Sequence, residues 1–113
     1  MTRRKEKPSR KSVAVKVVDE TTIRGRPRRG AKLKEEVWQT DGKVTKYSLA
    51  YVNFLVFQQA HGRVLGYDNS HGYQHRHFMG AVAPYKFQTY ESLAADFHQE
   101  VAELWSKEDE ENA

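Results

Sequence analysis

The sequence predicts an α+β fold: an antiparallel meander sheet of about five strands packed by one long C-terminal helix. Two observations predict it. Short runs rich in β-branched and aromatic residues alternate with turn residues up to about position 79. Beyond position 89, apolar residues recur at spacings of three and four, as on one face of a helix. At 113 residues, the chain is long enough for one domain with a single core.

The first thirty residues are predicted to form an arm, a strand and a loop. Residues 1–11 are polar and charged around a central proline, which predicts a flexible basic arm. From Ser12 to Val18, valine at every second position predicts a short strand at a sheet edge. Residues 19–30 include RGRPRRG, whose glycines and proline predict a flexible basic loop.

An Asp-Gly pair gives the most specific turn signal in the chain. Asp41-Gly42 lies between strand-like runs at 33–40 and 43–57, and both positions of a tight hairpin turn favour residues that tolerate a positive φ. The second run is apolar on both faces near its end, so it is either a central strand or a buried helix. Its β-branched and aromatic content favours the strand.

Two further turns frame two further strands. His61-Gly62 turns the chain into a strand at 63–68, and the residues from Asn69 to Gly72 turn it again into a strand at 73–79. These turns and strands complete the predicted sheet.

The last part of the chain is predicted to be a loop and a helix. Residues 81–87 include a proline and should form a connecting loop, and Thr89 suits the N-cap of the helix. The apolar stripe comprises Leu93, Phe97, Val101, Leu104 and Trp105. Acidic residues are unfavourable at a helix C-terminus, so the helix should fray by about Lys107. The predicted organisation is thus a single domain at 12–107 followed by an acidic disordered tail at 108–113.

Composition excludes some classes of protein and favours others. The absence of cysteine excludes disulfides and thiolate metal sites. No run approaches the roughly 18 apolar residues of a membrane span, and no apolar signal-peptide core is visible, so we expect a cytoplasmic protein without membrane contact.

Charge is distributed unevenly along the chain. Residues 1–34 hold 13 Lys or Arg against three acidic residues, whereas residues 35–113 hold six against twelve. A basic segment attracts polyphosphate, which makes RNA an expected partner. The nucleic-acid-binding residues expected on this basis are Arg24, Arg26, Arg28 and Arg29, together with Tyr73 as a base-stacking group.

The residues with chemical potential gather between positions 63 and 80, where three of the five histidines lie. A period of two places His75 and His77 on one face of their strand and Arg76 on the other, so only a bulge would bring Arg76 to the histidines. Paired imidazoles can act as acid and base near neutral pH, and arginine can bind phosphate. The predicted catalytic residues are His75, Arg76, His77, Asp68, His71 and Tyr67.

Two other interpretations of these residues stay open. Asp68, His71, His75 and His77 offer three nitrogens and an oxygen, so a hydrolytic metal site is conceivable, although the spacing matches no established motif. Alternatively, the histidines are exposed strand residues, Arg76 pairs with a carboxylate, and the chain binds nucleic acid or protein without catalysis. We expect no cofactor and no metal.

The stretches YSLAYVN, GRVLGYDNSHGYQHRHFMG and YESLAADFHQEV resemble the TumE-type toxins, over about residues 45–105. The resemblance implies the toxin of a toxin–antitoxin system, with a cognate antitoxin as partner and growth inhibition as its effect. Its motif falls on Tyr67, Asp68, Asn69, Gly72 and the triplet from His75 to His77. The chain departs from many members at Tyr73-Gln74, where they carry Gly-Asp or a similar pair, so Asp68 would have to supply the acid. We therefore expect a metal-independent ribonuclease, with a homodimer as one assembly to test.

Overall fold

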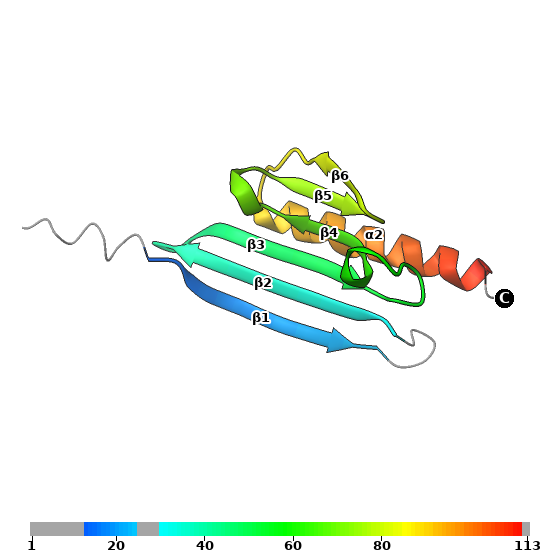
Figure 1. Ribbon diagram of the computed structural model, residues 1–113. Coiled ribbons are helices and arrows are strands. Elements are labelled where there is room, and N and C mark those ends of the chain that lie inside the picture. The colour runs from blue at the N-terminus through cyan, green and yellow to red at the C-terminus, as the bar shows by residue number, and fades with distance from the viewer. Residues whose placement is uncertain (1–12, 25–29, 112–113) are drawn as a thin grey trace, which may run out of the picture.

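A sheet of six antiparallel strands and one helix make up the fold. The computed structural model describes residues 13–24 and 30–111, and the sheet order follows the sequence order without a crossover. The strands are β1 (Val15–Ile23), β2 (Lys32–Thr40), β3 (Lys43–Val52), β4 (Arg63–Asp68), β5 (His75–Phe78) and β6 (Ala81–Pro84). The helix α2 (Tyr90–Glu111) lies across one face of the sheet (Figure 1). The predicted α+β meander is confirmed, with six strands instead of about five.

The Asp41-Gly42 turn joins β2 and β3 as predicted. Both residues have positive φ, 53° and 79°, which is the backbone geometry of a two-residue hairpin turn whose twist matches that of the strands. The following strand is shorter than predicted, however, because it ends at Val52 instead of continuing to residue 57. The Asn53 side-chain oxygen accepts a hydrogen bond from the Leu55 amide at 2.9 Å, and this Asx turn bends the chain away from the sheet.

The first strand begins later and ends later than predicted. β1 spans Val15–Ile23, so the expected break after Val18 is wrong. Asp19 to Thr22 are polar, but β1 pairs only with β2 and its residues are mostly exposed, so it needs no buried face. Residues 1–12 and 25–29 lie outside the described residues, and so do the predicted arm and the centre of the predicted basic loop.

The sixth strand was not predicted. The segment expected to be a loop at 81–87 begins with β6, which pairs with β5 through a hairpin turn at Met79 and Gly80. Both turn residues have positive φ, 45° and 88°. Pro84 is compatible with this strand because it lies at the strand's end on the edge of the sheet, where a missing N–H costs little.

The helix packs its predicted stripe against the sheet. Leu93, Phe97 and Val101 are buried, and Leu104 and Trp105 are partly buried beside them. The Thr89 hydroxyl caps the helix by accepting a hydrogen bond from the Ser92 amide at 3.0 Å.

The helix extends to Glu111, beyond its predicted end at Lys107. Tyr51 in β3 donates a hydrogen bond to the Glu108 carboxylate at 2.9 Å, which attaches this last part of the helix to the sheet despite the unfavourable helix dipole. Among the described residues, no helix is both long and apolar enough to span a membrane.

Candidate functional site

Asp68, His75 and His77 meet on the sheet face opposite α2. Asp68 pairs with His75 across β4 and β5, and Gly66 pairs with His77. Directly paired residues of an antiparallel sheet point to the same side, so the register brings the two imidazoles and the carboxylate together. The next pair, Tyr67 with Arg76, points to the other side.

The Asp68 carboxylate lies between the two imidazole rings. Its Oδ1 is 3.3 Å from His75 Nδ1, and its Oδ2 is 2.9 Å from His77 Nε2. Neither nitrogen meets the geometry of a formed hydrogen bond, so both contacts are electrostatic. The side chain of Asp68 is oriented by the Ser70 amide at 3.1 Å and the Ser70 hydroxyl at 2.8 Å, both of which donate to Oδ1.

Arg63 completes this group and was not among the predicted site residues. Its Nη2 donates a hydrogen bond to His77 Nδ1 at 2.9 Å, and its Nη1 lies 3.8 Å from Asp68 Oδ2. We call Asp68, His75, His77 and Arg63 the Asp68 cluster. Strict alternation would place Arg63 on the helix side, but a register shift against β3 between Leu65 and Arg63 reverses its direction.

Gly66 provides the space that Arg63 needs. A Cβ atom at position 66 would lie 2.7 Å from Arg63 Cδ, so a larger residue there would displace the arginine. A glycine inside a strand often marks the close approach of another group. This was the signal in the sequence from which the position of Arg63 could have been suspected.

The cluster holds its acid ionised and one histidine neutral. Burial alone would raise the pKa of Asp68, but the two hydrogen bonds from Ser70 and the neighbouring histidines hold that pKa below its ordinary value. Burial and the nearby Arg63 charge lower the pKa of His77, against the opposing effect of Asp68. Protonation of His77 at Nδ1 would also break the hydrogen bond from Arg63.

The two histidines therefore differ in what they can do. Since arginine only donates, His77 Nδ1 must accept, and the proton of the neutral ring lies on Nε2 and faces Asp68. Both nitrogens of His77 are thus engaged. His75 directs Nδ1 toward Asp68, which leaves Nε2 on the opposite side of the ring. This is the arrangement in which a carboxylate orients a histidine that acts as a base.

The same geometry bears on the metal interpretation. Asp68, His75 and His77 offer ligand atoms that all lie within 4.8 Å of one another. A metal needs a lone pair on its histidine ligand, and His77 Nε2 has one only if Arg63 releases Nδ1. The cation of Arg63 also opposes a second cation at Asp68. The cluster as it stands suits proton transfer better than metal binding.

The expected exposure of the histidines is wrong. His75 is only 6% exposed, and the ring of Tyr73 covers it with ring centroids 3.9 Å apart. Tyr73 itself is 56% exposed. The tyrosine therefore separates His75 from solvent and offers its own ring to a partner. His71 lies in the short 3-10 helix η2 (Ser70–Gly72) that precedes β5.

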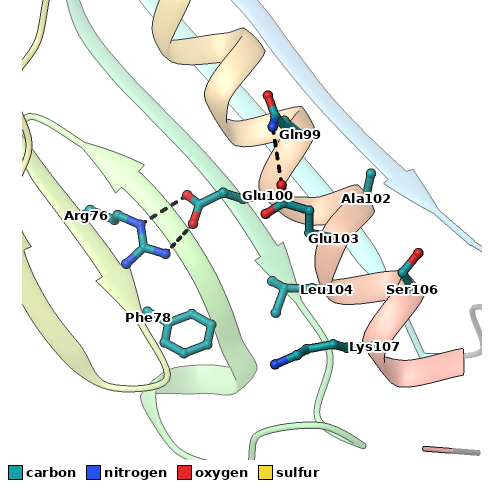
Figure 2. Close-up of a pocket in the computed structure, with 9 residues that line it drawn as sticks. All are labelled: Arg76, Phe78, Gln99, Glu100, Ala102, Glu103, Leu104, Ser106 and Lys107. Atoms are coloured by element: carbon teal, nitrogen blue, oxygen red, sulfur yellow. Dashed lines mark hydrogen bonds and ion pairs between the residues drawn. The ribbon is translucent and has the colours of Figure 1, made fainter. Parts of the chain in front are cut away.

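Arg76 and Tyr67, both predicted to be catalytic, lie on the helix side of the sheet. Arg76 donates two hydrogen bonds to the Glu100 carboxylate of α2, one of them from Nε at 3.1 Å, as Figure 2 shows. The Tyr67 hydroxyl donates to the same carboxylate. No bulge brings Arg76 round to the histidines, and the alternative expectation of a carboxylate partner is confirmed.

The predicted nucleic-acid-binding arginines are separate from the cluster or not described. The Arg24 guanidinium lies 5.7 Å from the ring centroid of Trp105 in α2, on the helix side. Arg26, Arg28 and Arg29 lie outside the described residues.

The fold and the site define a class of small α+β protein whose open sheet face carries a carboxylate, two imidazoles and an arginine. The sequence model of one protein family, described as Toxin TumE, matches residues 2–105, and the chain belongs to that toxin family. The match includes residues 2–44, which precede the stretch that carries the resemblance. The chain is therefore a toxin of a toxin–antitoxin system, with a cognate antitoxin as its partner. No curated protein and no solved structure matches the chain.

Proposed function

We propose that this toxin inhibits growth by cutting RNA at the Asp68 cluster, without a metal ion. The observation that carries the proposal is the shared carboxylate: Asp68 contacts His75 Nδ1 on one side and His77 Nε2 on the other, with Arg63 beside them. The activity would take place in the cytoplasm, where RNA is accessible.

In this mechanism His75 is the general base. Asp68 holds a proton on His75 Nδ1, so Nε2 can take the proton of a ribose 2′-hydroxyl. The 2′-oxygen then forms a bond to the adjacent phosphorus, and the bond from phosphorus to the 5′-oxygen breaks. The products are a 2′,3′-cyclic phosphate and a 5′-hydroxyl, and the departing oxygen takes up a proton. Tyr73 and His71 are the candidates to donate it.

Arg63 stabilises the charge that develops on phosphate. A guanidinium is always protonated and matches the geometry of phosphate oxygens. The side chain of Arg63 is 31% exposed, so a phosphate can approach its guanidinium from solvent. His77 holds the guanidinium in place through Nδ1 and acts as a positioning residue.

The test compares two histidine variants of the purified protein on labelled RNA. His75→Gln should lower the cleavage rate about 10²- to 10⁴-fold and relieve growth arrest. His98→Gln is the matched control, because His98 is a half-exposed residue of α2 that contacts Glu35 and Phe97 and lies apart from the Asp68 cluster. Analysis of the RNA ends should reveal the cyclic phosphate.

The alternative function is a binding module that stops growth without cleavage. It predicts that folded His75→Gln protein arrests growth as strongly as wild type and that intact RNA is recovered from both. That result would refute the catalytic proposal.

A further inference from the structure

We infer that the open face of β2, β3 and β4 is a binding track for single-stranded RNA that leads to the Asp68 cluster. The inference rests on the proposed function, because the track would deliver the strand that His75 cuts. It assigns a role to Lys32, Lys34 and Phe54, which belong to no site described above.

The sheet register makes the track continuous with the cluster. Lys34 in β2 pairs with Ala50 in β3, Ala50 pairs with Gly66 in β4, and Gly66 pairs with His77 in β5. These paired positions therefore form one row across the face opposite α2. Three strand spacings separate Lys34 from His77, which is about 14 Å. About four stacked nucleotides would cover that distance at 3.4 Å each.

The floor of this face is hollow because its residues are small. A cavity of about 370 Å³ is open to solvent above Ser48 and Ala50, and Lys32, Lys34 and Arg63 line it. No α-helix covers this face within residues 13–24 and 30–111 (Figure 1), and Ala60 and His61 of the 3-10 helix η1 (Ala60–Gly62) also line the cavity. A strand of nucleic acid can lie flat on such a surface, as on other sheets that bind single-stranded RNA.

The charge of the hollow suits a phosphate backbone. Lys32, Lys34 and Arg63 contribute three positive charges. Glu36 is the one carboxylate among the lining residues, and Lys16 Nζ neutralises it at 2.9 Å. The net field over the floor is therefore positive and attracts polyanions.

An aromatic ring also lines the hollow. Phe54 is 55% exposed, and its ring lies against Gly62, where a Cβ atom would be 2.8 Å away. An exposed ring held in this way provides a platform on which a base can stack. A peptide partner would not require such a platform. Basic side chains beside a small floor and an exposed ring together favour RNA as the occupant.

The experiment measures binding of a fluorescently labelled RNA of about 12 nucleotides, a length that matches common single-strand sites. All its riboses carry 2′-O-methyl groups, so wild-type protein cannot cut it by attack of a 2′-hydroxyl. Lys32→Glu/Lys34→Glu should weaken binding about tenfold or more, and the slope of log K against log salt should become shallower by about 1.4 for two lost phosphate contacts. Phe54→Leu should weaken binding about fivefold or more.

Lys43→Glu/Lys86→Glu is the charge-matched control, because both lysines are exposed and neither lines the hollow. This control should bind RNA within about twofold of wild type, because both reversed charges lie outside the hollow and salt screens them. If both double variants weaken binding equally, net charge explains the effect and the track is refuted.

The remaining outcomes separate the track from cleavage. If the wild type cleaves RNA and the Lys32→Glu/Lys34→Glu protein binds and cleaves RNA equally well, the track is refuted and the proposed function is left intact. If the wild type cuts no RNA but the Lys32→Glu/Lys34→Glu protein specifically loses RNA binding, the track is supported and the cleavage proposal is refuted. Loss of antitoxin binding with unchanged RNA affinity assigns the face to the antitoxin and refutes the RNA track.

Discussion

The aliphatic stem of Arg63 crosses its own strand over Gly66, and this contact places the guanidinium beside His77. Residue 66 thus controls the position of a charge that belongs to residue 63. The effect of a methyl group there can be predicted directly.

Gly66→Ala should displace Arg63 and lower activity about as much as Arg63→Ala does, by roughly 10²-fold for a lost charge-stabilising group. The cost in unfolding free energy should stay near 1–3 kcal/mol, typical of overpacking. The double variant should be no less active than either single one, because both changes remove the same interaction. Cleavage kinetics of the three variants test this, and additive losses would contradict it.

Arg76→Ala should act on stability instead of on chemistry. Arg76 anchors β5 to α2 through Glu100, which also accepts from Tyr67. Because both partners are partly exposed, we expect a loss of about 1–3 kcal/mol in unfolding free energy. Cleavage should persist below the lowered melting temperature, with a rate near that of wild type. Melting curves and assays at low temperature measure both effects. A stable but inactive Arg76→Ala protein would restore the catalytic role that the motif predicts.

Phe97→Ala should destabilise the domain by about 3–5 kcal/mol, because the ring is fully buried between α2 and the sheet. Such a loss is much of the stability of a small domain. Thermal or urea unfolding provides the measurement. A melting curve that matches wild type would show that the helix does not close the core.

Stability should fall as the solution becomes acidic. The pKa of His77 is lowered from its ordinary 6.5, so the unfolded chain binds this proton more readily than the folded one. The contribution of His77 is complete above pH 6.5 and is lost as the pH falls below it. Asp68 and Glu100 also have lowered pKa values and add a loss at more acidic pH, below about their ordinary 3.8 and 4.5.

Urea unfolding at pH 7.5 and 5.5 checks this pH dependence. His77→Gln should show a smaller difference between the two pH values than wild type, because glutamine does not titrate. An equal difference in both proteins would show that another group is responsible.

Chelators should leave the cleavage rate unchanged, because Arg63 holds the His77 lone pair that a metal would need. Dialysis against EDTA followed by the RNA assay tests this. Loss of activity that returns with Zn²⁺ or Mn²⁺ would support the metal interpretation instead, and Asp68→Asn should then lose metal affinity as well as activity.

Local signals predicted the sheet better than its edges. The Asp41-Gly42 turn and the apolar stripe around Phe97 are strong because turn chemistry and helical periodicity act over a few residues. The strand at Asp19 to Ile23 and the strand β6 were missed because an edge strand needs only a partner, and neither a proline nor polar residues prevent that pairing.

Part of the site could be predicted for the same reason. A period of two brings His75 and His77 to one face, and pairing with the neighbouring strand adds Asp68. Arg63 depends on a register shift and on the space above Gly66, which are properties of two strands in contact. Gly66 indicates that a group approaches the strand closely, but no pattern in the sequence shows that the side chain of Arg63 turns to that face. The pairing of Arg76 with Glu100 was only one of two alternatives from the sequence, because the two residues lie 24 positions apart.

The order of the strands has a consequence for how the toxin is made. Every strand pairs with its neighbour in sequence, so the sheet can form hairpin by hairpin as the chain leaves the ribosome, from local contacts that form quickly. The helix follows all six strands, and until it docks the apolar side of the sheet is uncovered and Arg76 lacks Glu100. The strands that hold the Asp68 cluster therefore lack this contact with α2 until the helix has been synthesised. We expect a nascent chain to be inactive until that point, so that the antitoxin would have to neutralise only the released protein.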